Sequence, residues 1–272
     1  MPAPEAGALD DLHGGFPPPP VPKAALVTGG ARRIGRALVL ALAEDGYAVA
    51  VHHHASRPDA EALVTDIEQV GGRAVALSAD LADEQAVKGL LPQAVAALGP
   101  VGVLVNNASI FENDTVATVT RDSWDAHLAV NLRAPFVLIQ EFAARLPPDS
   151  GGVVINLLDE RVWNLTPYFL SYTLSKSALW TLTQSTALGL APRIRVNGIG
   201  PGPTLPSPRQ TEAQFAAQCA AMPLGHGTTP EEIAAAVRYI LAAPSLTGQI
   251  IALDGGQHLG WAVPARAPEW RE

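Results

Sequence analysis

Short apolar runs alternate with helical segments along almost the whole of this 272-residue chain. A strand that is buried on both faces shows an unbroken apolar run, and parallel strands need helical crossovers between them. The predicted strands cover residues 24–28, 48–52, 74–78, 101–106, 153–157, 194–199 and 249–253. The predicted helices cover residues 35–45, 59–70, 83–98, 121–146, 168–190, 211–221 and 230–242. Because such crossovers are right-handed, this order predicts one α/β domain with a doubly wound, seven-stranded parallel sheet.

The domain should span residues 23–260. A hydrophobic content of 48% suits a single large domain that buries roughly three quarters of its unfolded surface. Residues 1–22 contain Pro17-Pro18-Pro19-Pro20 and no basic region followed by an apolar one. We therefore expect a disordered, proline-rich tail there, not a signal peptide, with a proline-motif ligand as the alternative role. Residues 261–272 form a second, C-terminal tail.

Charge and cysteine content exclude several classes of protein. The net charge is −8, which argues against a general nucleic-acid-binding surface. Cys219 is the only cysteine, so no internal disulfide can form and a reducing, cytoplasmic compartment fits. No apolar run reaches the ~18 residues of a membrane span.

A glycine-rich turn follows the first predicted strand. Gly29 to Gly35 spells G-G-A-R-R-I-G and leads directly into a helical pattern. Strand, turn and helix together predict a cradle for a dinucleotide phosphate, because the helix N-terminus offers unpaired N–H groups and a partial positive charge. Arg33 stands where a middle glycine often stands. The alternative is a tight turn that binds no ligand.

Tyr172 and Lys176 lie four residues apart, so a helix places them on one face. An ammonium group near a phenol lowers the pKa of that phenol, which would suit Tyr172 to acid–base work closer to neutral pH. The alternative is a simple surface pair. Thr166 as N-cap and Pro167 as first helical residue predict the start of this helix.

Asn131 precedes Pro135 by four residues inside another predicted helix. Proline has no N–H group, so the carbonyl of Asn131 loses its partner within the helix. A free carbonyl there could hold a water molecule between itself and Lys176. The alternative is an ordinary helix kink.

With these motifs in order, the chain resembles the short-chain dehydrogenase/reductase family over residues 23–260. The matching motifs are Thr28-Gly29…Gly35, Asp80-Leu81, Asn106-Asn107-Ala108, Asn131, Tyr172…Lys176 and Pro201-Gly202. Within the family, it most resembles the pteridine reductase and dihydromonapterin reductase branch. Four features carry that likeness: Arg33 in the turn, Asp159 where most members have serine, Ser109 followed by Phe111, and His52-His53-His54 at the end of the second strand.

The resemblance implies a Rossmann-type domain that binds NADPH. An NAD enzyme usually places Asp or Glu after the second strand, whereas this chain has no carboxylate there until Asp59. The branch has arginine where this chain has Ala55, and Arg57 is the possible substitute. The expected cofactor-binding residues are Gly29, Arg32, Arg33, Ile34, Gly35, His53, His54, Ser56, Asp80, Leu81, Asn107, Ala108, Ser109, Lys176, Pro201 and Gly202. The alternatives are solvated strand-end histidines and, for Asp80, a helix N-cap. No metal site is expected, because neighbouring strand residues point to opposite faces.

The resemblance also implies the catalytic groups. Asn131, Asp159, Tyr172 and Lys176 are the expected catalytic residues, and Ser109, Phe111, Asp159 and Tyr172 the expected substrate-binding residues. Asp159 would protonate a ring nitrogen of a pterin and Phe111 would stack on the ring, while residues 201–208 form the substrate loop. The alternatives are a salt bridge from Asp159 to Arg161 and a core role for Phe111.

These expectations predict an NADPH-dependent reductase of pterin-type C=N bonds. The alternative is a short-chain reductase of a ketone or 3-oxoacyl substrate, followed by a non-catalytic NADP-binding regulator. The resemblance further implies a homotetramer, whose interface would involve the two long helices predicted over residues 121–146 and 168–190.

Overall fold

The apolar runs form one sheet of seven parallel strands. The computed structural model describes residues 19–260. The strands are β1 (Ala24–Val27), β2 (Ala48–His53), β3 (Ala74–Ser78), β4 (Val103–Asn106), β5 (Gly152–Leu157), β6 (Ile194–Pro201) and β7 (Ile250–Leu253). Their order across the sheet is β3-β2-β1-β4-β5-β6-β7, and every pairing is parallel. The predicted fold class, a doubly wound seven-stranded parallel sheet, is confirmed.

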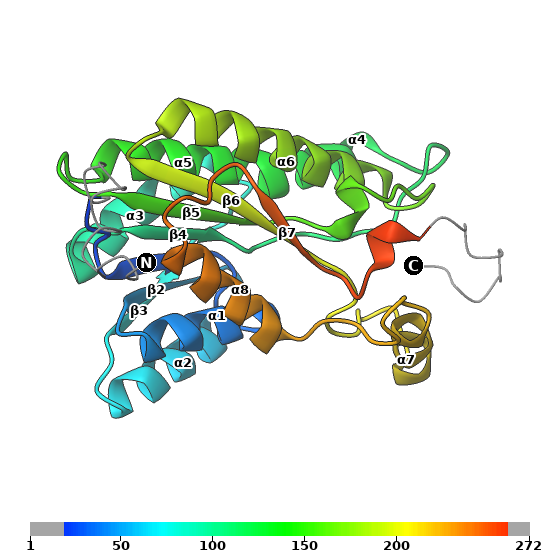
Figure 1. The fold of residues 1–272 in the computed structure, drawn as a ribbon, viewed down its shortest axis with the longest axis horizontal. Coiled ribbons are helices and arrows are strands. Elements are labelled where there is room, and N and C mark those ends of the chain that lie inside the picture. The colour runs from blue at the N-terminus through cyan, green and yellow to red at the C-terminus, as the bar shows by residue number, and fades with distance from the viewer. Residues whose placement is uncertain (1–18, 261–272) are drawn as a thin grey trace, which may run out of the picture.

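Helices cover both faces of the sheet (Figure 1). They are α1 (Arg33–Glu44), α2 (Arg57–Gln69), α3 (Glu84–Leu98), α4 (Arg121–Leu128), α5 (Ala134–Arg145), α6 (Leu170–Leu190), α7 (Glu212–Ala220) and α8 (Pro230–Ala242). Helices α1, α2 and α8 lie on one face and α3 to α6 on the other, while α7 lies beside the carboxyl ends of the strands (Figure 1).

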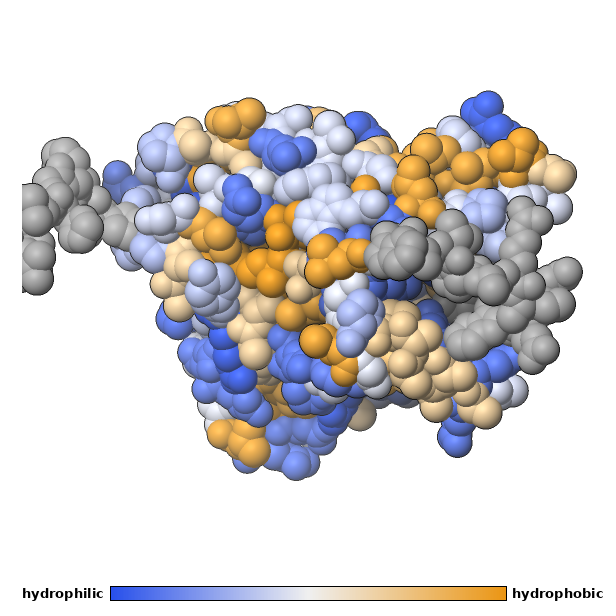
Figure 2. Space-filling view, turned by 45° about the vertical axis from the view of Figure 1, so that its right-hand side comes forward, coloured by the Kyte–Doolittle hydropathy of each residue, from blue (hydrophilic) through white to orange (hydrophobic). Residues whose placement is uncertain are grey.

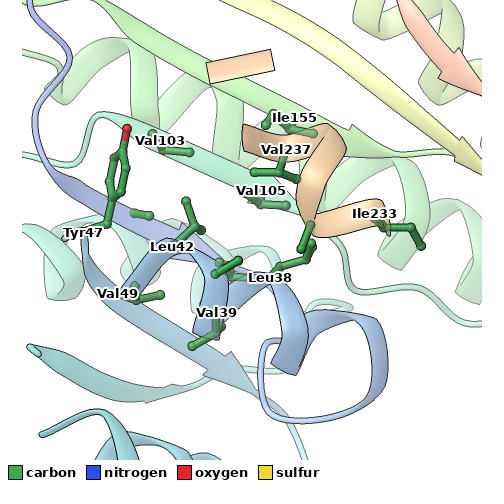
Figure 3. Close-up of a cluster of buried hydrophobic side chains, with 14 of the residues drawn as sticks. Leu38, Val39, Leu42, Tyr47, Val49, Val103, Val105, Ile155, Ile233 and Val237 are labelled. Carbon is green, nitrogen blue, oxygen red and sulfur yellow. The ribbon is translucent and has the colours of Figure 1, made fainter. Parts of the chain in front are cut away.

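Two hydrophobic cores result from the alternation of strand side chains. Val27, Val105 and Ile155 belong to the core on the face that α1 and α8 cover. Figure 3 shows Leu38 of α1 and Val237 of α8 in the same cluster as Val105 and Ile155. The intervening residues of the same strands join a second core beneath α3 and α5. Full burial of an apolar side chain of this size contributes about 1.5–3 kcal/mol. The two cores therefore stabilise the packing of helices on both faces of the sheet.

Side-chain caps begin several of the helices where the sequence predicts. Asp83 caps α3, while Thr211 and Thr229 begin α7 and α8 with capping boxes. The predicted N-cap of α6 is wrong: this helix begins at Leu170, and Thr166 forms a local turn with Tyr168 instead.

The helix predicted over residues 121–146 is interrupted. A π-helical turn at Ala129–Arg133 separates α4 from α5, and the N–H of Ala134 bonds to the carbonyl of Ala129. Such turns occur mostly as single insertions, frequently at functional sites. The distortion expected from Pro135 therefore takes the form of a π turn around Asn131.

Residues 19–22 belong to the ordered part of the molecule, although they were predicted as tail. The carbonyl of Pro20 accepts the N–H of Gly151, and the carbonyl of Pro22 passes 2.3 Å from where a Cβ of Gly102 would lie. This proline strap (residues 19–22) crosses the amino ends of β4 and β5. The rest of the N-terminal tail and the tail over residues 261–272 lie outside the described residues.

Among residues 19–260, no helix is both long and apolar enough to cross a bilayer. Figure 2 shows polar and apolar side chains mixed over one face of the molecule. Leu174 and Leu188 of α6 are exposed, and the predicted homotetramer, in which this helix would be covered, stays a prediction.

Gly35 is the position at which the turn after β1 tolerates no side chain. A Cβ there would lie 2.0 Å from the carbonyl oxygen of Gly29. We expect Gly35→Ala to lower the free energy of unfolding by about 1–3 kcal/mol, because backbone must move to make room. The matched control is Gly189→Ala in α6, where no atom lies within 4 Å of the added methyl group. This change should stabilise the helix by about 0.5–1 kcal/mol. Urea unfolding of the two variants checks both signs, and equal destabilisation would refute the crowding argument.

Candidate active site

A cleft of about 280 Å³ opens at the carboxyl ends of β1, β4, β5 and β6. This is the position at which doubly wound sheets bind ligands, because the strand order reverses between β1 and β4. Predicted site residues that line it are Arg33, Ile34, Asn107, Ser109, Phe111, Asp159, Tyr172, Lys176, Pro201 and Gly202. The fold therefore brings these predicted residues together at one cleft.

Tyr172 and Asp159 form the central pair of the cleft. The phenol hydroxyl donates to Asp159 Oδ2 over 2.6 Å, and Asp159 Oδ1 accepts the N–H of Arg161. Burial raises the pKa of Tyr172 above its usual value, and the Asp159 carboxylate raises it further. The expectation of a lowered Tyr172 pKa is thus wrong for this structure, since burial and the carboxylate outweigh the nearby positive charges. Tyr172 remains a protonated donor.

Asp159 lines the cleft and also forms the salt bridge to Arg161 that was its alternative role. The guanidinium of Arg161 lies 3.6 Å from the same Oδ2 atom that Tyr172 contacts. Asp159 also begins a short 3₁₀ helix at Glu160–Val162, so its backbone is held in place. The salt bridge to Arg161 does not remove the carboxylate from the cleft.

Lys176 is buried beneath Tyr172. Its ammonium group donates to the carbonyl of Leu157 over 2.7 Å and lies 5.8 Å from the centre of the Tyr172 ring. Burial lowers the pKa of Lys176 to about 8. An ammonium group has three donors, so a ligand hydroxyl in the cleft can take one of those that Leu157 leaves.

Asn131 ties the π turn to the wall of the cleft. Its Oδ1 accepts the N–H of Ile110 and the hydroxyl of Ser109, and its Nδ2 donates to Ser175 Oγ. The side chain thus holds the loop after β4 against α6. The water relay expected from the Asn131 carbonyl stays a prediction.

Phe111 joins an aromatic stack at the mouth of the cleft. Its ring lies 4.3 Å from that of Phe169 in a parallel stack and meets Tyr172 edge-on at 4.6 Å. The guanidinium groups of Arg161 and Arg209 lie 5.2 Å and 5.0 Å from the Phe111 ring centre. Phe111 is only partly buried and lines the cleft, so the alternative of a core residue does not describe it fully.

The glycine-rich turn is fastened to the end of β4. Thr28 Oγ1 accepts the N–H groups of Asn107 and Ala108, while Asn107 Nδ2 donates to the carbonyls of Thr28 and Gly29. On the other side, His52 Nδ1 accepts the N–H of Gly29. Burial lowers the pKa of His52 to about 4, which keeps the ring neutral and able to accept this bond.

The first turn of α1 fits a phosphate group. No side chain caps this helix, so its leading N–H groups have no partner within the helix. Arg33 adopts φ +52°, the left-handed region that favours glycine, and its guanidinium donates to the carbonyls of Leu205 and Pro206. A non-glycine residue in this region costs about 1–2 kcal/mol. Arg33 therefore joins the turn to the substrate loop.

The remaining predicted cofactor residues lie outside the cleft. Arg32 forms an ion pair with Asp59, and Ser56 precedes α2 without capping it by its side chain. His53 is buried whereas His54 is exposed, so the alternative of solvated histidines holds for His54 alone. Asp80 accepts the N–H of Ala82 in a local turn. It is therefore not the N-cap of α3, a position that Asp83 fills, and Leu81 beside it is buried.

Sequence reasoning missed several residues of the site. Phe169 falls inside the helix predicted over residues 168–190 and belongs to no motif, whereas in the structure it precedes α6 in the left-handed conformation, at φ +56°. Arg209 stands in the loop before α7, which carries no motif, and its guanidinium lies beside the Phe111 ring while it pairs with Glu112 at 3.2 Å. Gln257 comes from the short segment after β7 and also lines the cleft. Only the tertiary fold brings these side chains together.

The lowered pKa of Lys176 predicts a pH dependence of stability. Between pH ~8 and pH ~10, the unfolded chain keeps a proton that the folded chain has lost, so stability should rise with pH over this window. We expect the free energy of unfolding of the wild type to rise on the order of 1–3 kcal/mol over this window, and the rise to be absent in Lys176→Met. Urea unfolding across this pH range measures it, with exposed Lys88→Met as the control that keeps the rise. Parallel curves for the wild type and Lys176→Met would contradict the burial argument.

Comparison with known proteins agrees with this geometry. The family model of the short chain dehydrogenases matches residues 23–216. A 3-oxoacyl-[acyl-carrier-protein] reductase, FabG, from Staphylococcus aureus is 34% identical over 245 residues, which cover 87% of this chain and 98% of that protein. An uncharacterized oxidoreductase of Escherichia coli, YgfF, is likewise 34% identical over 245 residues, which cover 86% of this chain and 99% of that protein.

Solved structures share the fold at higher identity. The crystal structure of FolM alternative dihydrofolate reductase 1 from Brucella suis in complex with NADP superposes with a TM-score of 0.86 and 49% identity, covering 89% of this chain and 97% of that one. A blue fluorescent protein from a metagenomic library in complex with NADPH gives a TM-score of 0.80 and 37% identity, covering 86% and 97%. Motifs, fold and matched length agree, and the chain belongs to the short-chain dehydrogenase/reductase family of oxidoreductases.

Proposed function

We propose that this protein is an NADPH-dependent reductase of the C=N bonds of dihydropterin-type rings. The observation that carries the proposal is the 2.6 Å hydrogen bond from the Tyr172 hydroxyl to Asp159 Oδ2 inside the cleft. A C=N bond needs a hydride at carbon and a proton at nitrogen. The carboxyl group of Asp159 can hand a proton to a ring nitrogen, and Tyr172 can replace it.

Several groups of the chain suit the proposed cofactor, which supplies the hydride when it is bound. The uncapped first turn of α1 would hold the pyrophosphate, and the Lys176 ammonium a ribose hydroxyl. Arg32 already neutralises Asp59, which leaves that carboxylate poorly placed to hold an adenosine ribose and favours a 2′-phosphate. The NADP and NADPH complexes of the similar structures support the same choice.

The state of Tyr172 suits the direction of reduction. Its raised pKa keeps the phenol protonated at neutral pH, so the group is available as a donor. Tyr172 and Asp159 both line the cleft, and one hydrogen bond joins them, so a proton can pass from the phenol to the carboxylate as the carboxyl group protonates the substrate. Positioned acid–base groups of this kind typically contribute about 10²–10⁴-fold in rate.

The substrate class follows from the walls of the cleft. Phe111 offers a flat apolar surface beside Tyr172, and Ser109 offers a hydroxyl next to it. A planar heterocycle can stack on such a ring at a favourable distance. The likeness to FolM, a dihydrofolate reductase at 49% identity, supports a pterin-type ring over an aliphatic ketone.

The second candidate is a 3-oxoacyl or ketone reductase, which the 34% identity to FabG favours. Such a substrate needs only a hydrogen-bond donor for its oxygen, and Tyr172 alone meets that need. A 3-oxoacyl or ketone reductase would leave Asp159 without a role. A non-catalytic NADP-binding regulator would leave Asp159, Tyr172 and Lys176 without a common purpose.

Assembly and compartment form part of the same proposal. The exposed leucines of α6 suit a helix that packs against a second subunit of a homotetramer. A single cysteine and the demand for NADPH suit a cytoplasmic enzyme.

The proposal predicts a split between two activities in Asp159→Ser. Dihydropterin-dependent oxidation of NADPH, followed by absorbance, should fall by about 10²–10⁴-fold because the proton donor is lost. Any reduction of ketones or 3-oxoacyl thioesters should be spared, and the dissociation constant for NADPH should stay within about twofold of the wild type. Asp66→Ser, in an exposed ion pair on α2, is the matched control and should change neither. An unimpaired pterin rate in Asp159→Ser, or a wild-type enzyme that turns over ketones alone, contradicts the proposal.

A further inference from the structure

A buried polar cluster, which the proposed chemistry does not use, lies between the loop after β4 and the start of α6. Asp114, His127 and Ser171 are exposed by only 3%, 1% and 1%. The hydroxyl of Ser171 donates to the Asp114 carboxylate and lies 2.8 Å from His127 Nδ1. The three side chains come from a loop, from α4 and from α6. Burial of polar groups is costly unless they are hydrogen-bonded, and these three side chains bond to one another.

The neighbours of His127 determine its tautomer. The backbone N–H of Glu112 donates to Nε2 over 3.2 Å, and the carbonyl of Ser123 lies 2.9 Å from Nδ1. A backbone N–H can only donate and a carbonyl can only accept. Nε2 therefore carries the lone pair and Nδ1 the proton, so the ring is neutral.

The same cluster replaces the missing N-cap of α6. Phe169 precedes this helix without capping it, and the N–H groups of Leu170 and Ser171 bond to the backbone carbonyl and the Oδ1 of Asp114. Burial alone would raise the pKa of Asp114, but hydrogen bonds from Ser171 and Ser123 lower it overall. An ionised carboxylate at the N-terminus of a 21-residue helix is favoured by the helix dipole.

These bonds connect the two sides of the active site. Glu112 directly follows Phe111, and Ser171 directly precedes Tyr172. His127 contacts both segments, through Nε2 and through Nδ1. The path from Phe111 to Tyr172 through the buried His127 and Ser171 is therefore short, and it accompanies the direct contact of the two rings at 4.6 Å.

We propose that His127 is a positioning residue, which holds Phe111 at its spacing from Tyr172 by accepting the N–H of Glu112 as the neutral Nδ1–H tautomer. Asp114 and Ser171 orient the imidazole and anchor it to α6. The inference rests on the proposed function only in assigning substrate stacking to Phe111. Loss of the bond would loosen one wall of the cleft and leave the phosphate turn, on the other side of it, unchanged.

Two substitutions of His127 separate its two contacts. In His127→Gln, the amide oxygen reaches the place of Nε2 and can still accept from Glu112. In His127→Asn, the shorter amide reaches only the place of Nδ1, so the Glu112 N–H loses its partner. Hydrogen exchange of the backbone amides from Phe111 to Asp114 measures the loss of this hydrogen bond directly and needs no substrate.

We expect at least about tenfold faster exchange of the Glu112 amide in His127→Asn and little change in His127→Gln. The KM for the substrate that the wild type reduces should rise about tenfold in His127→Asn only. The dissociation constant for NADPH should stay within about twofold in both variants. Equal exchange and equal KM in the two variants would overturn the inference.

A measurement on the unmutated protein keeps the test independent of how well the variants fold. Long-range ¹H–¹⁵N correlation spectra distinguish the two neutral tautomers and the imidazolium, and the His127 signals are assigned by their loss in His127→Gln. The Nδ1–H form supports the inference, and either other form overturns it. If the wild type does not reduce dihydropterins but the exchange rates still separate, the proposed function fails and the positioning role of His127 stands.

Discussion

After β1 and after β4 the chain turns to opposite faces of the sheet, which leaves a crevice between the carboxyl ends of these two strands. Hydrogen bonds must join the two strand ends at the base of this crevice. Thr28 and Asn107 close it with four hydrogen bonds that join the glycine-rich turn to the end of β4. Because the backbone of both strands takes part, neither can shift without the other. The phosphate side of the site and the loop that carries Ser109 and Phe111 are both built outward from this junction.

On the side of the cleft that holds Tyr172 and Lys176, burial determines the pKa of each group. Burial lowers the pKa of the Lys176 ammonium group, so that this group loses its proton more readily. Burial raises the pKa of the Tyr172 phenol, which becomes a weaker acid. Asp159 receives a hydrogen bond from the phenol and lies near a guanidinium. The arrangement places a protonated phenol beside a carboxylate and an apolar ring, which suits the proposed reduction of a C=N bond.

The sequence predicted the doubly wound parallel sheet and the grouping of candidate residues at its carboxyl edge, because both depend on local signals. Apolar runs mark the strands, and Tyr172 and Lys176 share a helical face whatever surrounds them. Properties set by distant groups were not predictable. The pKa of Tyr172 depends on burial and on Asp159, Arg32 is engaged by a residue 27 positions away, and the start of α6 is held by Asp114 instead of Thr166. His127 gave no signal, since its partners come from three segments.

The proline strap over residues 19–22 bears on how this protein can be shortened. It covers the amino ends of β4 and β5, and two glycines at these ends leave room for its backbone. A chain trimmed to the first strand would leave the N–H of Gly151 without its partner and two hollows open to solvent. The boundary of the folding unit therefore lies ahead of the first β-strand, and an affinity tag or a protease site belongs before Pro19.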